Sequence, residues 1–206
     1  MNAAGTGPIE AAGPTLVTER LVLRPWRTED LDPMAELNGD ADTMRYFPAP
    51  LDREQSDTFV RRMVQSFEWS GTGLWAVEVP GVATCIGAVG LLRVGFEAPF
   101  TPAVEVGWRL ARPYWGQGYA SEAGAASLRY GFEALGLDSI VSFTSVANRP
   151  SQAVMGRLGM HRDPGGDFDH PRIPSDHPLS RHVLYRVDRR QWEAEEGQGG
   201  PAGTVA

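Results

Sequence analysis

The strongest constraint on the fold is the stretch 112–123, RPYWGQGYASEA, which sets two closely spaced glycines between a strand-like pattern and a run of small residues. Gly116 and Gly118 allow backbone angles and close approaches that a Cβ would block. Because the loop precedes an expected helix, the first helical amides lack internal acceptors and can bind a phosphate. Taken alone, the stretch fits a tight structural turn and a phosphate-binding loop equally well.

The remaining elements alternate between strands and helices, with no internal repeat and no interdomain linker. Strands are expected at about 18–26, 73–79, 84–92, 103–111, 139–146 and 182–187. Helices are expected at about 28–37, 52–69, 119–135 and 150–158. The segment Asp163–Arg181, rich in Pro, Asp and His, is expected to be a loop. This order predicts one α/β domain with helices packed on a central sheet.

Composition limits the organisation of the chain. With 206 residues and 42% hydrophobic residues, one sizeable core is expected, over residues 16–192. The polar, small-residue ends, 1–15 and 193–206, are expected to be a disordered leader and tail. No apolar run reaches the length of a membrane span, and the N-terminus lacks a secretory pattern. A cytoplasmic domain without membrane contact is therefore expected.

Charge and cysteine content exclude several classes of function. A net charge of −7 argues against sequence-independent nucleic-acid binding and mildly favours a cationic partner. All 19 basic residues are Arg, so a catalytic Lys is impossible. The single Cys85 rules out an internal disulfide and a multi-Cys zinc site. Because Cys85 lies in an apolar run, we expect a buried thiol rather than a nucleophile.

Two longer stretches, VEVGWRLARPYWGQGYASEA and SFTSVANRPSQAVMGRLGM, together resemble the central motifs of the GNAT N-acetyltransferase superfamily. The pattern is most similar to the branch of ribosomal-protein-alanine N-acetyltransferases, the RimJ/RimL type, over about Thr18 to Arg162. The resemblance implies a single-domain α/β fold, with about seven strands in a mixed, mainly antiparallel sheet and about four flanking helices. It also implies a splay between the fourth and fifth strands.

The resemblance further implies acetyl-CoA as the donor, bound without a metal. By carry-over, the loop amides would hold the pyrophosphate; they belong to Trp115, Gly116, Gln117, Gly118, Tyr119 and Ala120. The backbone of the strand near Trp108 and Leu110 would pair with the pantetheine arm, and Asn148 would contact the same arm. Pro113 stands where many relatives have Gln or Arg, so any side-chain help from that position is missing. An apolar core role is the alternative for Trp115 and Tyr119.

Glu105 is the candidate general base. An α-amine, with a pKa of about 8, is partly neutral at pH 7, whereas a Lys amine, at about 10.4, is almost fully charged. A modest base therefore suffices for an N-terminal substrate. Apolar Val104 and Val106 flank Glu105, so partial desolvation would raise its pKa. The alternative is an ion pair between Glu105 and an Arg across the sheet.

The position at which the family usually carries its general acid holds a residue that cannot donate a proton. Many GNAT enzymes use a Tyr in the second motif's helix, but Met155 occupies that position here. Ser151 is the candidate substitute, and a helix-capping role is the alternative for it. Because a thiol with a pKa near 8.5 is a good leaving group, water could also supply the proton.

All four histidines lie within His161–His182. Their spacing does not match a zinc site, so hydrogen bonds that stabilise the loop are expected instead. A third possibility is that this segment walls the acceptor pocket, with His182 or Tyr185 as a reserve acid or base.

The leading hypothesis is an acetyl-CoA-dependent N-acetyltransferase that acts on a protein N-terminal α-amine. The alternatives are a small-molecule amine as acceptor, such as an antibiotic, a polyamine or an amino acid, and a non-catalytic acyl-CoA sensor, which Met155 would favour. Acceptor contacts are expected from the segments 38–50, 96–102 and 161–182, with Trp26, Tyr46 and Phe47 as possible walls or core residues. The chain is expected to be a monomer or a homodimer.

Overall fold

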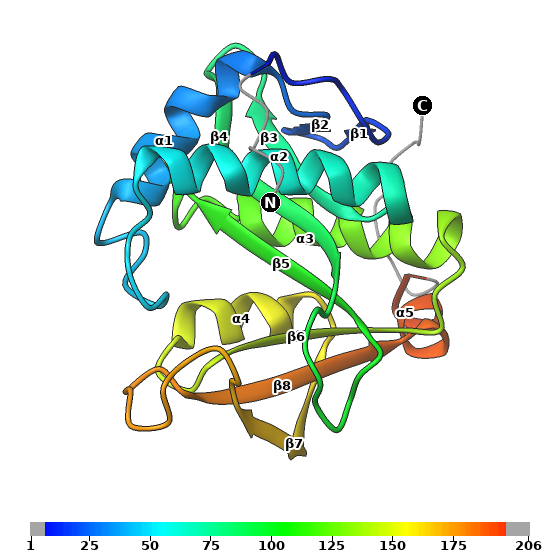
Figure 1. The fold of residues 1–206 in the computed structure, drawn as a ribbon. Coiled ribbons are helices and arrows are strands. Elements are labelled where there is room, and N and C mark those ends of the chain that lie inside the picture. Colours follow the sequence, from blue (N-terminus) through cyan, green and yellow to red (C-terminus); the bar gives the residue numbers. More distant parts are fainter. Residues whose placement is uncertain (1–6, 197–206) are drawn as a thin grey trace.

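The structure is a computed structural model that describes residues 7–196 (Figure 1). One eight-stranded sheet has the strand order β1-β2-β3-β4-β5-β6-β8-β7. The strands are β1 (Leu16–Val17), β2 (Val22–Arg24), β3 (Gly73–Val79), β4 (Ala83–Arg93), β5 (Val104–Leu110), β6 (Ser139–Ser145), β7 (His161–Asp169) and β8 (Arg181–Asp188). Neighbouring strands are antiparallel except β5 and β6, which are parallel. The predicted mixed, mainly antiparallel α/β sheet is confirmed.

The helices are α1 (Leu31–Gly39), α2 (Arg53–Ser70), α3 (Tyr119–Arg129), α4 (Arg149–Arg157) and α5 (Arg189–Glu196). Two single 3₁₀ turns, Thr28–Asp30 and Arg112–Tyr114, precede α1 and the glycine loop, and a π-helical turn, Tyr130–Ala134, extends α3. Figure 1 shows α2 in front of the sheet and α3 behind it. The four helices expected from the sequence are present.

Local sequence signals set the ends of α2. The Asp52 carboxylate accepts a hydrogen bond from the amide of Gln55 at 2.8 Å, and the Gln55 side chain accepts one from the amide of Asp52 at 3.0 Å. This reciprocal capping satisfies two amides that the helix itself leaves free. At the other end Gly71 adopts φ +68°, the left-handed conformation that terminates helices.

The core lies on both faces of the sheet. One cluster joins α1 and α2 to the sheet around buried Trp26, Met34 and Val60, and it includes Cys85. The other joins α3 and α4 to the sheet around Val106, Leu128 and Met155. Burial raises the pKa of the Cys85 thiol to about 12. The prediction of a buried, unreactive thiol is confirmed.

Strands β5 and β6 meet at one end and then separate. Their register contains a single pair, Glu105 with Val141. Beside it, the Ser142 hydroxyl donates to the carbonyl of Val106 at 2.9 Å. Figure 1 shows the two strands diverging from this end. The expected splay, between the strands counted as fourth and fifth from the sequence, is thus present.

The prediction that Asp163–Arg181 is entirely a loop was wrong. Residues up to Asp169 form β7, which pairs with β8, although its register shifts between Asp163 and Phe168. Pro164, Gly165 and Gly166 fall in this irregular part. An edge strand tolerates proline and glycine where its pairing is interrupted, so the residues that indicated a loop mark a bulge instead. The short strand β1 and helix α5 were not predicted either.

Hydrogen bonds and helical structure extend beyond the domain limits expected from the sequence, residues 16 and 192, at both ends. Ile9, within the expected leader, donates its amide to the Thr28 hydroxyl at 3.1 Å. The Pro14 carbonyl accepts from the indole of Trp75 at 2.7 Å. Helix α5 continues past Trp192 to Glu196. Residues 1–6 and 197–206 lie outside the described residues. Within 7–196, no helix is long and apolar enough to cross a membrane.

Candidate active site

The glycine loop presents a row of free backbone amides at the start of α3. Gly116 and Gly118 have φ of +73° and +84°, so both require a residue without a Cβ. Among the hydrogen bonds within residues 7–196, the amides of 116–121 donate none. The amide of Trp115, by contrast, donates to the Arg112 carbonyl at 3.1 Å. Five of the six amides expected to hold a pyrophosphate are therefore available, and the Trp115 amide is engaged in the preceding turn.

Side chains hold this loop in place. The Trp115 indole donates to the Leu110 carbonyl at 2.7 Å, and the Gln117 amide group donates to the Pro113 carbonyl at 3.0 Å. Arg20 donates to the Gln117 carbonyl at 2.9 Å and forms an ion pair with Glu122. Arg20 was not singled out from the sequence, because nothing local shows that residues 97 positions apart will meet.

The end of β5 and the start of α4 are linked by a small polar network. The Ser151 hydroxyl accepts from the Trp108 indole at 3.2 Å and from the Asn148 side-chain amide at 3.0 Å. The Asn148 amide also donates to the Thr144 hydroxyl at 2.9 Å. Asn148 caps α4, since its side-chain oxygen Oδ1 accepts from the Ser151 backbone amide at 3.2 Å. The capping role considered for Ser151 thus belongs to Asn148.

Met155 packs in the core and takes no part in this network. Its side chain is 1% exposed and belongs to the apolar cluster beneath α3 and α4. A thioether has no proton to give, so any proton donor has to come from another position.

Glu105 lies where β5 and β6 meet, and its side chain is partly buried. Desolvation raises its pKa to about 7, and the positive charge of Arg172 opposes that rise. The carboxylate forms no ion pair within residues 7–196, so the cross-sheet pair considered as its alternative role is not found. At neutral pH a group with this pKa is poised to gain or lose a proton.

Alternation along β5 places Glu105, Gly107 and Arg109 on one face of the sheet. Arg109 contacts α1 and α2 from this face: it donates to the Asn38 side-chain oxygen at 2.5 Å, and its guanidinium lies over the ring of Phe59. A Cβ added at Gly107 would meet no heavy atom within 4 Å, so the space above this residue is open. The two-residue period could have singled out Arg109 from the sequence.

An aromatic cluster joins the β4–β5 connection and β6 to the segment His161–His182. Its members are Phe96, Phe100, Phe143, Phe168, His170 and His182. The two imidazole rings lie 5.0 Å apart, and burial lowers the pKa of both, that of His170 to about 4. Arg172 donates to the Gly95 carbonyl and so ties the two segments together.

The two reserve acids considered from the sequence lie in different environments. His182 is buried in the aromatic cluster, with Nδ1 3.0 Å from the Ser180 carbonyl. Tyr185 packs against the core cluster between the sheet and helices α3 and α4. Within residues 7–196, no three His, Cys, Asp or Glu side chains are grouped so that they could hold a metal ion.

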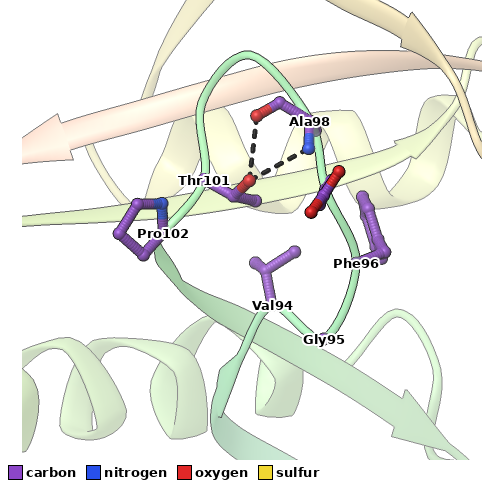
Figure 2. A pocket seen from close by; sticks show the side chains of 7 residues that line it. Val94, Gly95, Phe96, Ala98, Thr101 and Pro102 are labelled. Atoms are coloured by element: carbon purple, nitrogen blue, oxygen red, sulfur yellow. Dashed lines mark hydrogen bonds between the residues drawn. The ribbon is translucent and has the colours of Figure 1, made fainter.

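The β4–β5 connection forms a hollow of about 700 Å³, lined by Val94, Gly95, Phe96, Glu97, Ala98, Thr101 and Pro102. Figure 2 shows the Thr101 hydroxyl hydrogen-bonded to both backbone groups of Ala98, which holds the loop in a tight turn. The hollow lies near the Glu105 end of β5, away from the glycine loop. One of the segments expected to contact an acceptor is thus concave.

Two parallel strands that separate beside a free helix N-terminus form the candidate site, and a carboxylate of raised pKa lies where the strands meet. Residues 20–161 match the family model described as an acetyltransferase (GNAT) domain, and the chain belongs to this family. It is therefore an acyltransferase, and enzymes of this family use acetyl-CoA as cosubstrate.

Individual relatives support the same assignment. The FsC-acetyl coenzyme A-N(2)-transacetylase of Aspergillus fumigatus is 30% identical over 196 residues, which cover 88% of this chain and 79% of that protein. A GNAT-family acetyltransferase from Bacillus anthracis superposes with a TM-score of 0.71 at 27% identity, covering 85% of this chain and 99% of that one. An acetyltransferase from Agrobacterium tumefaciens gives 0.68 at 29% identity, with coverages of 89% and 99%.

Proposed function

We propose that the protein transfers an acetyl group from acetyl-CoA directly to a primary amine, with a protein N-terminal α-amine as the first candidate acceptor. The observation that carries this proposal is the single strand β5, which bears the base candidate Glu105 near its start and leads toward the free amides of 116–121. Membership of the family supplies the donor, and the resemblance to the ribosomal-protein-alanine branch supplies the acceptor.

The described residues fit the donor. The free amides of 116–120, at a helix start that a Cβ would disturb, suit a pyrophosphate. The backbone of Trp108 and Leu110, beyond the single β5–β6 pair, and the side chain of Asn148 would contact the pantetheine arm. Acetyl-CoA, when bound, supplies an acetyl thioester.

Glu105 would act as the general base. Because its pKa is near 7, a substantial fraction is ionised at neutral pH and can take a proton from the attacking amine, directly or through a water. The amine nitrogen forms a bond to the acetyl carbon, and the C–S bond breaks with its electron pair left on sulfur. Positioning of the two reactants provides much of the rate, so no acyl-enzyme is required.

Ser151 would give its hydroxyl proton to the sulfur and regain one from solvent water, while the proton taken by Glu105 is released to solvent. Its hydroxyl accepts two hydrogen bonds, from Trp108 and Asn148, and these occupy its acceptor sites. The hydroxyl hydrogen therefore points away from both donors and stays free to be given. This arrangement supports Ser151 in place of the family's usual tyrosine.

A small-molecule amine is the second candidate acceptor. The name of the relative from Aspergillus fumigatus describes transfer from acetyl coenzyme A to N(2) of FsC, so the fold is compatible with acceptors other than ribosomal proteins. The non-catalytic acyl-CoA sensor considered from the sequence, which Met155 would favour, is not proposed, because the chain belongs to a family of acetyltransferases.

Turnover separates these possibilities. The purified protein is incubated with acetyl-CoA and a panel of N-terminal peptides and small amines, and the released thiol is followed. Release that depends on the amine, with the acetylated product seen by mass spectrometry, supports the enzyme. Micromolar binding of CoA without release on any amine would contradict the proposed transfer to these acceptors. Selective turnover of small amines would shift the proposal to the second candidate.

A further inference from the structure

Arg109 carries a positive charge that no carboxylate of residues 7–196 pairs with. Its guanidinium lies under the rings of Phe47, at 4.1 Å, and Phe59, at 5.0 Å, and it donates to the neutral side-chain oxygen of Asn38. No carboxylate within residues 7–196 forms an ion pair with it, and desolvation alone lowers its pKa to about 10. A partly buried cation without an anion is costly unless something else supplies one.

The free atoms of the guanidinium point to where that anion would lie. Nε is buried and has no partner in the described structure, whereas Nη1 is held by Asn38. Nη2 also has no hydrogen-bond partner among residues 7–196, yet it is not buried. One edge of the guanidinium is therefore sealed, and its tip remains reachable.

Open space lies above Gly107, between this tip and Glu105 on the same strand. Gly107 lies between Glu105 and Arg109 on the same face of β5, and no heavy atom lies within 4 Å of the position that a Cβ would take. Glu105 and Arg109 each lie two residues from Gly107, which corresponds to about 6–7 Å along the strand in either direction. An acceptor lying along this face would meet a base at one end and a cation at the other.

Resting on the proposed function, we infer that Arg109 is a specificity-determining residue that binds an anionic group of the acceptor, so that the preferred substrate is a primary amine carrying a carboxylate at a distance from the amine. The reachable Nη2 can donate charge-assisted N–H hydrogen bonds to a carboxylate. The overall charge of −7 would not attract such an acceptor, so its recognition would depend on this local contact.

The test compares acceptors that differ only in the anion. One series contains ω-amino acids from glycine to 6-aminohexanoate, and the matched series contains n-alkylamines of equal length. A third pair uses the peptides Ala-Asp-Gly-amide and Ala-Asn-Gly-amide. We expect kcat/KM to favour the acid by at least about tenfold at the best chain length, a factor that corresponds to about 1.4 kcal/mol. Preference in the amino-acid series indicates a small acceptor, and preference in the peptides indicates an acidic protein N-terminus.

Variants assign the preference to Arg109. Arg109→Met is expected to abolish it and to leave kcat/KM for the alkylamines within about threefold, whereas Arg109→Lys should retain part of it. Arg62→Met, at an exposed position on α2, is the matched control and should keep the full preference. If Arg109 merely supports α1 and α2, both series would lose activity equally in Arg109→Met. Equal kcat/KM for acids and alkylamines in the native chain would also overturn the inference.

Binding keeps the test independent of turnover. With saturating CoA, titration calorimetry with 6-aminohexanoate and with hexylamine measures the same preference without chemistry. If no amine is acetylated but the acid binds more tightly than the amine and loses this advantage in Arg109→Met, the proposed activity fails and the anion site stands. If 6-aminohexanoate and hexylamine bind with equal affinity, the anion site is contradicted. Arg109→Gln serves in place of Arg109→Met if thermal unfolding shows that the latter does not fold.

Discussion

The Ser151 hydroxyl accepts a hydrogen bond from the Trp108 indole at 3.2 Å, which ties the start of α4 to β5 across the opening between β5 and β6. A second donor, the Asn148 amide, also reaches this oxygen. A serine held in this way has one free hydrogen, and its position is set by groups on two different elements. The candidate proton donor is thus oriented by the same residues that border the expected donor arm.

Ser151→Ala should lower kcat by about 10- to 100-fold, because a positioned proton donor contributes an effect of this order. KM for acetyl-CoA should change by less than about threefold. Thr144→Val is the matched control, since it removes another acceptor of the Asn148 amide and leaves Ser151 in place. Steady-state kinetics on both variants decide the matter. An unchanged kcat with a raised KM would show that Ser151 only positions Trp108 and Asn148.

Glu105→Gln should reduce kcat/KM by about 10²- to 10³-fold at pH 7.5, since it removes the base. In the native chain the rate should rise with pH through an apparent pKa near 7, the value to which burial raises this carboxyl. The variant should lose that rise. Glu68→Gln, on the exposed side of α2, is the control. A pH–rate profile of the variant that still bends near 7 would assign the base to another group.

The same shift has a consequence for stability. The pKa of Glu105 is higher in the folded state than in the unfolded state, so ionisation of this carboxyl opposes folding. Its protonated form contributes fully to stability below the unfolded pKa, and this contribution is lost as the pH rises through about 7. Glu105→Gln should therefore be more stable than the native chain at pH 8.5, by about 2–3 kcal/mol, and comparable to it at pH 4.5. Urea unfolding at the two pH values measures the difference. Equal gains at both would contradict a raised pKa.

Gly116→Ala should weaken CoA binding by about tenfold or more, because the loop would have to leave φ +73° to accommodate a Cβ, and its amides would turn. Gly81→Ala is a close control. Gly81 has φ +74°, and neither glycine's added Cβ would meet an atom within 4 Å, so both variants carry the same backbone strain. Calorimetric titration with CoA should separate them. Equal affinities would remove the loop amides from the donor site.

Arg24 holds a buried charge network at the edge of α1. Its guanidinium donates two hydrogen bonds to Asp30, each at 2.8 Å, and one to Glu78 at 2.7 Å. Arg24→Met should reduce the free energy of unfolding by about 3–5 kcal/mol, because it leaves the buried carboxylate of Asp30 without its ion-pair partner. Arg53→Met, which breaks exposed ion pairs, should cost less than about 1 kcal/mol. Urea unfolding of the two variants provides the comparison.

Several parts of this protein could be predicted from its sequence. The glycine loop, the strand from Val104 and the caps of α2 depend on neighbours a few residues away, so local patterns indicate them reliably. Cys85 was correctly placed in the core from its apolar surroundings. The segment Asp163–Arg181 was misjudged because a proline and two glycines are compatible with a bulged edge strand as well as with a loop. Only the pairing of β7 with β8 distinguishes the two.

The chemistry-bearing residue types and their order along the chain were determined by the sequence alone: a carboxylate at 105, a free-amide loop at 116–121 and a serine at 151. The tertiary structure decided which of them meet. Desolvation of Glu105, the hydrogen bond from Trp108 to Ser151 and the contact of the Arg109 guanidinium with Asn38 all arise from segments far apart in the chain. Local patterns cannot specify such contacts, because burial and electrostatic environment are properties of the packed whole.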